Sequence, residues 1–116
     1  MSDHRLPTDL WVSAGLKRCS VEHVPAVLRH RGDAKGGMVV LKLTRNHSGD
    51  THAADCQVLS QMRDMNGKLG FSAVHDADFI PDADAETYIA RAVERDPDLW
   101  VVEVESGDGW HPFDDA

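Results

Sequence analysis

The amino-acid sequence predicts a single α+β domain, residues 1–116, in which a mainly antiparallel sheet carries two helices packed on one face. Two segments place apolar residues at helical spacing, five others alternate or concentrate β-branched residues, and turn-forming residues separate them. The predicted order of elements is α-β-β-β-β-α-β. The chain has 116 residues, enough for one core without metal or disulfide support, and we expect residues 1–7 and 114–116 to be loose.

The first helix is predicted to begin at Thr8 or Asp9, either of which can cap it, and to run to about His23. Its apolar face is formed by Val12, Leu16 and Cys19. Gly15 costs a helix about 1 kcal/mol relative to alanine. We therefore expect a neighbouring group to pack closely against this glycine.

Two hairpins are predicted in the middle of the chain. Residues 26–31 and 38–45 form the first, across a glycine-rich turn. Residues 56–63 and 69–75 form the second, because the Asn-Gly pair at 66–67 tolerates the positive φ angles of a tight turn.

The closing part of the chain is predicted to form a helix and then a strand. Asp82 or Asp84 can cap the helix, and Pro97 ends it because proline disfavours helical angles in the residue before it. We expect one face of strand 99–105 to lie in the core beneath this helix: Trp100, Val102 and Val104. The opposite face begins apolar and ends acidic, so its far end should meet water: Leu99, Val101, Glu103 and Glu105. A brief edge segment is expected at 110–113.

Charge divides unevenly along the chain. Residues 1–58 carry eight Lys/Arg and six Asp/Glu, a balance of +2, whereas residues 59–116 carry four and fourteen, a balance of −10, which together give the net charge of −8. Such an acidic surface disfavours a nucleic-acid-coating role. It is compatible with a basic partner, and it also serves solubility.

Neither the cysteines nor the apolar segments indicate a secreted or membrane protein. Cys19 and Cys56 lack a disulfide-rich spacing, so we expect two buried thiols. No segment approaches the ~20 apolar residues of a membrane span, and the first residues lack the apolar core of a signal peptide. These features predict a cytoplasmic protein with no membrane partner.

Both ends of the chain resemble a known family. Trp11-Val12-Ser13-Ala14, followed by Leu16-Lys17-Arg18, resembles the opening helix of a small bacterial family called domain of unknown function 1491. Tyr88-Ile89-Ala90-Arg91 and the string DPDLWVVE at 96–103 are similar to its closing motif, and His111-Pro112-Phe113 to its tail. The resemblance covers nearly the full length, although residues 46–74 match less well. It implies a small soluble protein and carries no activity, cofactor or catalytic residue.

A polar loop offers candidate metal ligands. Five donor side chains fall within ten residues: His47, Asp50, His52, Asp55 and Cys56. Zinc prefers such ligands, so His47, His52 and Cys56 are the candidates for a small-ligand or metal-binding protein, with hydrolysis as the associated chemistry. Their spacing matches no familiar paired-ligand pattern, and a solvated loop is the alternative. His75 beside Asp76 is a candidate acid–base pair, although neighbours on a strand point to opposite faces.

The sequence lacks a nucleophile elbow, a phosphate-binding glycine loop and a dinucleotide fingerprint. It therefore favours a non-catalytic protein-interaction or regulatory domain that uses no cofactor and binds an unknown protein or a second copy of itself. The candidate interaction residues are Arg91, Asp96, Asp98, Glu103 and Glu105. A basic group on the first predicted hairpin lacks interleaved aromatic residues, so nucleic acid is not expected: Arg29, His30, Arg31, Lys35, Lys42 and Arg45.

Overall fold

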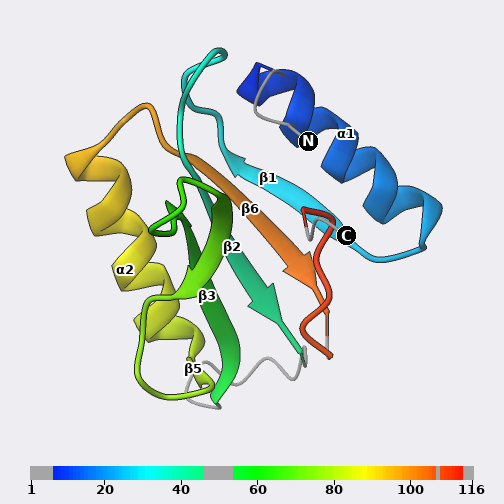
Figure 1. Cartoon of the computed structure of the whole chain (residues 1–116). Helices are drawn as coiled ribbons and strands as arrows, with labels where there is room; N and C mark the ends of the chain where they lie inside the picture. The colour runs from blue at the N-terminus through cyan, green and yellow to red at the C-terminus, as the bar shows by residue number, and fades with distance from the viewer. Residues whose placement is uncertain (1–6, 46–53, 107, 114–116) are drawn as a thin grey trace.

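The computed structural model describes residues 7–45, 54–106 and 108–113, and within them two helices flank one six-stranded sheet (Figure 1). The elements are α1 (Thr8–Val21), β1 (Ala26–His30), β2 (Val39–Thr44), β3 (Ala54–Arg63), β4 (Leu69–Ala73), β5 (Ile80–Pro81), α2 (Asp82–Arg95) and β6 (Trp100–Glu105). The α+β class and the order of the elements are confirmed, and the short β5 is an addition. The β3–β4 hairpin is also confirmed, with Gly67 at a φ of 80° in its turn.

Strand β6 lies inside the sheet, whose order is β1-β6-β2-β3-β4 with β5 paired to β3. It runs antiparallel to β1 and parallel to β2. The predicted β1–β2 hairpin is therefore wrong, because β6 separates these two strands. The residues at the start of β6 are apolar on both sides of the strand, which suits a central position buried on both faces.

The two helices cover opposite faces of the sheet, so the predicted packing on one face is wrong (Figure 1). Trp100 is 1% exposed, as expected for a core residue, but it packs on the side of α1 with Val102 and Val104. Leu99 and Val101 face α2 instead. Because successive strand residues point to opposite faces, one apolar strand supplies both cores and needs a helix on each side.

Both helices begin after a proline instead of a capping side chain. Pro7 and Pro81 occupy the N-cap positions, and neither makes a side-chain capping hydrogen bond. The predicted caps at Thr8 or Asp9 and at Asp82 or Asp84 are therefore wrong. Acidic residues still fill the first turn of each helix, where negative charge complements the helix dipole. The end of α2 at Asp96-Pro97 is as predicted.

The segment after β6 folds back over α1 and forms no strand among residues 106 and 108–113, so the predicted edge segment is wrong. Its anchor is Phe113, which is 7% exposed and packs with Trp11 and Phe71. The Phe113 ring also fills the space where Gly15 lacks a Cβ. The close neighbour expected at Gly15 is thus a residue from the other end of the chain.

Candidate functional site

Two groups of polar residues are assembled by the fold, and the first is an ion cluster on the α2 side of the sheet. Its members are Arg29, Lys42, Asp82, Glu86 and Glu103. The parallel register of β2 and β6 places Lys42 beside Glu103, while the first turns of α2 bring Asp82 and Glu86 over them. Ion pairs therefore connect three strands, β1, β2 and β6, to helix α2.

Lys42 and Arg29 bridge the carboxylates. The Lys42 side chain is 3% exposed, and its Nζ donates to Oδ1 of Asp82 and to Oε2 of Glu86, each at 2.5 Å. The Arg29 guanidinium donates to Oε1 of Glu103 at 2.6 Å and to Oε1 of Glu86 at 2.7 Å. Glu86 thus receives hydrogen bonds from both cations and joins β1 and β2 to α2.

These contacts keep the cluster charged. The hydrogen bond from Arg29 first, and that from Lys42 next, lower the pKa of Glu86 to about 2. Burial acts to lower the pKa of Lys42, but the hydrogen bonds to Asp82 and Glu86 and the charge of Glu103 outweigh it, so this pKa is raised. A lysine held in its ammonium form is a poor nucleophile.

The Cys56 thiol borders the ion cluster, with its Sγ 3.8 Å from Oδ1 of Asp82. Burial raises the pKa of Cys56 to about 11, against the opposing influence of Lys42. The thiolate is the reactive form of cysteine, so this side chain stays inert near neutral pH. Because its ion pairs join β1, β2 and β6 to α2, the cluster holds this helix against the sheet.

The second group lines an open hollow of about 600 Å³ on the other side of the molecule. We call it the acidic hollow, and its lining residues are Glu22, Val24, Glu105, Ser106, Asp108 and Trp110. Three of these six carry carboxylates, and none is basic. The residues come from the end of α1, the turn before β1, the end of β6 and the tail that follows.

Backbone hydrogen bonds hold the walls of the acidic hollow in place. The amide of Val24 donates to the carbonyl of Cys19 at 2.9 Å, past His23 with its φ of 61°. At the end of β6, the amide of Glu105 donates to the carbonyl of Pro25 at 2.9 Å. Because these bonds involve main-chain atoms, the positions of Val24 and Glu105 do not depend on side-chain rotamers.

Asp108 organises the tail side of the hollow. Its Oδ1 accepts hydrogen bonds from the amide of Trp110 and the hydroxyl of Ser106, both at 3.1 Å. The amide of Trp110 contributes most to the lowered pKa of Asp108, followed by the Ser106 hydroxyl. Asp108 is therefore a carboxylate at neutral pH, and its second oxygen takes no part in these two bonds.

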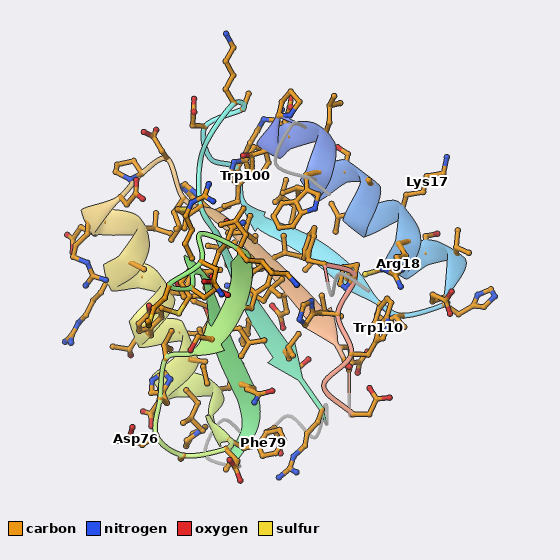
Figure 2. The ribbon with its side chains drawn as sticks, in the orientation of Figure 1. Lys17, Arg18, Asp76, Phe79, Trp100 and Trp110 are labelled. Atoms are coloured by element: carbon orange, nitrogen blue, oxygen red, sulfur yellow. The ribbon has the colours of Figure 1, made fainter. Side chains whose placement is uncertain are left out.

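Arg18 supports the indole of Trp110 from α1. Its guanidinium carbon lies 5.5 Å from the centre of the Trp110 ring, and its Nη1 donates to the carbonyl of Pro112 at 3.2 Å. Figure 2 shows Arg18 reaching Trp110 while the neighbouring Lys17 extends away from the protein. Arg18 thus fixes the wall of the hollow without lining it.

The structure places the candidate metal ligands unevenly. His47, His52 and Asp50 lie outside the described residues, and the Cys56 side chain is buried at 1% exposure between sheet and α2. Within the described ranges, no group of three or more His, Cys, Asp or Glu residues is arranged to hold a metal ion. The metal site stays a prediction. The two cysteines are both buried and unpaired, as expected.

His75 and Asp76 do not form an acid–base pair in the structure. The His75 ring packs edge-on against Tyr88, with centroids 5.7 Å apart. Its Nδ1 is buried and makes no hydrogen bond within the part of the chain that the structure describes. Asp76 is exposed, so the contacts of His75 are structural.

The candidate interaction residues fall into three places. Arg91, Asp96 and Asp98 are exposed along the end of α2 and the turn after it. Glu103 is half-buried in the ion cluster, and Glu105 lines the acidic hollow. Only the far residue of the acidic strand face therefore meets water freely.

The basic group does not form one patch. Lys42 is buried and Arg29 is paired with carboxylates, while Arg31 lies over the Trp100 ring and Arg45 over the Phe79 ring. His30 Nδ1 lies 2.7 Å from the carbonyl oxygen of Leu99. Arg31, Lys35 and Arg45 are nevertheless exposed, and the expectation that nucleic acid is not the partner stays a prediction.

Sequence reasoning singled out Glu105 but missed the rest of the acidic hollow. Glu22 and Trp110 are far apart in the chain, and no spacing rule connects them. The Ser-Gly-Asp-Gly-Trp run at 106–110 was the available signal, since a tryptophan directly after a polar turn suits a binding surface, where this residue is enriched. In the described residues, neither helix is long and apolar enough to cross a membrane.

Comparisons with known proteins agree over nearly the whole chain. A family model described as a protein of unknown function, DUF1491, matches residues 6–114. A crystal structure of a DUF1491 family protein from Caulobacter crescentus CB15 is 30% identical, with a TM-score of 0.79, and the match covers 95% of this chain and 96% of that one. An NMR structure of a DUF1491 family protein from the same organism is 33% identical, with a TM-score of 0.74 and coverage of 95% and 94%.

A more distant solution structure, protein Atu0922 from A. tumefaciens, is 21% identical, with a TM-score of 0.67 and coverage of 88% and 86%. This likeness concerns the fold alone. No curated protein matches the chain.

Proposed function

The chain belongs to the DUF1491 family of proteins of unknown function, and we propose that it is a non-catalytic interaction domain. In this proposal it binds a basic segment of a partner protein at the acidic hollow. The observation that carries this proposal is the lining of the hollow. Three carboxylates and an indole line an open volume of about 600 Å³, and none of its described lining residues is basic. Tryptophan is enriched at protein-binding surfaces, and the carboxylates supply charge complementary to a basic segment.

The chemistry of the other polar residues supports a binding role over catalysis. The charged groups of the ion cluster are paired with one another and connect α2 to the sheet. The pKa values of Lys42 and Cys56 are raised, so neither side chain is an activated nucleophile. Among the described residues that line the hollow, the ionisable groups are the carboxylates of Glu22, Glu105 and Asp108. These carboxylates are suited to binding a cationic group rather than to catalysing proton transfer.

A titration with defined peptides tests the proposal. Isotope-labelled protein is titrated with a short peptide of alternating basic residues and glycine, and separately with its glutamate counterpart. We expect the basic peptide alone to shift the amide resonances of residues 22–24 and 105–110. Raising the salt concentration should weaken binding, because the exposed carboxylates are screened over about 10 Å at 0.1 M salt.

Paired variants give the control. Glu105→Gln with Asp108→Asn removes two charges from the hollow, whereas Glu94→Gln with Asp84→Asn removes two from the exposed face of α2. Only the first pair should weaken peptide binding. Equal losses in both pairs would mean attraction to net charge alone, and shifts centred elsewhere would overturn the proposed site. Sedimentation of the same variants distinguishes self-association, which would show as a dimer.

A further inference from the structure

We infer that the group entering the acidic hollow is the guanidinium of an arginine side chain of the partner protein. This inference rests on the proposed function and deepens it, because it names the chemistry that the hollow recognises.

The carboxylates approach the hollow from separate directions. Glu22 comes from the end of α1, Glu105 from the end of β6 and Asp108 from the tail. A guanidinium presents five N–H donors in one plane, so it can meet carboxylates placed on different sides at once. An ammonium is a compact, strongly hydrated point charge and gains less from such a spread.

The indole of Trp110 already holds a guanidinium of this chain. Arg18 stacks over it from α1 while bonding the carbonyl of Pro112. Trp110 lines the hollow, whereas Arg18, which lies over its ring, does not. Arg18 is therefore a positioning residue, which orients a ring suited to a second planar cation.

Val24 supplies an apolar surface for the rest of such a side chain. It lies between Glu22 and the start of β1, is half-buried, and packs against the α1-side core. The methylene stem of arginine covers apolar surface of this kind while its charged end reaches the carboxylates. The hollow thus offers Val24 for the methylene stem of an arginine side chain, and carboxylates and an indole for its guanidinium.

Three small probes test the inference without a partner: N-acetyl-arginine amide, N-acetyl-lysine amide and N-acetyl-citrulline amide, whose planar head is neutral. We follow the indole N–H resonance of Trp110 in labelled protein. The arginine probe should shift it in a saturable manner and bind about threefold more tightly than the lysine probe, the scale of a stacked cation. The citrulline probe should leave it unchanged.

Variants then separate the contributions. Glu105→Gln and Asp108→Asn should each weaken the arginine probe about threefold, as for an exposed ion pair, while Glu94→Gln should have no effect. Trp110→Leu lacks the indole reporter, so its binding is followed by the backbone amide of Glu105, and it should remove the preference for arginine over lysine. A backbone amide spectrum of each variant verifies the fold, and Trp110→Phe keeps a ring if the leucine variant is unfolded.

The outcomes distinguish the two proposals. If the basic peptide binds at the hollow but the arginine, lysine and citrulline probes bind alike, the guanidinium inference is wrong and the interaction domain stands. If the arginine probe binds and the peptide does not, the hollow takes a small cation and the interaction function is wrong. If neither binds there, both are overturned.

Discussion

The ring of Phe113 lies directly over the Cα of Gly15. A Cβ built at Gly15 would fall 2.6 Å from Cζ of the ring, closer than real carbon atoms approach. The same ring contacts Trp11, with centroids 4.6 Å apart. Helix α1 and the tail therefore meet at a residue that has no side chain.

We expect Gly15→Ala to destabilise the protein by about 1–3 kcal/mol, because overpacking outweighs the roughly 1 kcal/mol gained in helix propensity. Urea unfolding measures the change. Gly70→Ala is the matched control, since nothing lies within 4 Å of a Cβ at Gly70. A Gly15→Ala variant more stable than wild type would contradict the packing described above.

Removing the buried cation of the ion cluster should be costly. Lys42→Ala leaves Asp82 and Glu86 facing each other without their ammonium, and we expect a loss of about 3–5 kcal/mol in the free energy of unfolding. Lys42→Met keeps the apolar stem and should lose less. Lys68→Ala, on the exposed hairpin turn, should stay within about 0.5 kcal/mol of wild type. Equal stability of Lys42→Ala and wild type would show that the ion cluster does not stabilise the packing of α2 on the sheet.

The ion cluster should also make stability depend on pH. Glu86 has a pKa of about 2 in the folded protein against 4.5 for an ordinary glutamate. A depressed pKa contributes stability that is present above about pH 4.5 and is lost as the pH falls toward 2. Because the side chain is 36% exposed, solvent screening leaves about 1 kcal/mol of this contribution. The stability difference between wild type and Glu86→Gln should shrink by that amount over this range, and a constant difference would exclude the effect.

The thiols should react only when the protein unfolds. Burial raises the pKa values of both Cys19 and Cys56, and both side chains are 1% exposed. In a thiol-reagent assay at neutral pH, we expect no reaction in buffer and two reactive groups in denaturant. Rapid reaction of the native protein would show that one of the two cores opens readily.

Trp100 should dominate the α1-side core. It is 1% exposed, and its indole Nε1 donates to the carbonyl of Asp33 at 2.8 Å. Trp100→Phe should lose about 1 kcal/mol with the hydrogen bond, and Trp100→Ala about 3–5 kcal/mol with the ring. Thermal unfolding compares the two. A loss of the same size in both variants would mean that the hydrogen bond, and not the ring, is what stabilises this position.

Much of the local structure could be predicted because its causes are local. Pro97 ends α2 by fixing its own φ and disfavouring helical angles at Asp96, and Gly67 supplies the positive φ of 80° in the turn of the second hairpin. The close approach at Gly15 was also foreseeable, since a glycine inside a helix usually marks such a contact. The identity of the contacting residue was not, because Phe113 lies 98 positions later.

The acidic hollow and the ion cluster illustrate the opposite case. Glu103 and Glu105 share one face of a strand in any arrangement, yet one is bound by Lys42 and Arg29 while the other faces the hollow. Which charges become neighbours depended on β6 entering the sheet between β1 and β2. No spacing in the chain encodes that insertion.

By itself, the sequence determined the class of the fold, the order of the elements and the burial of Trp100, because hydrophobic periodicity and turn chemistry act over a few residues. Only the tertiary structure decided which strands pair, and that the two helices take opposite faces of the sheet. The physical reason is that β6 is apolar on both sides: alternation along a strand assigns residues to faces, but it does not say which helix covers which face.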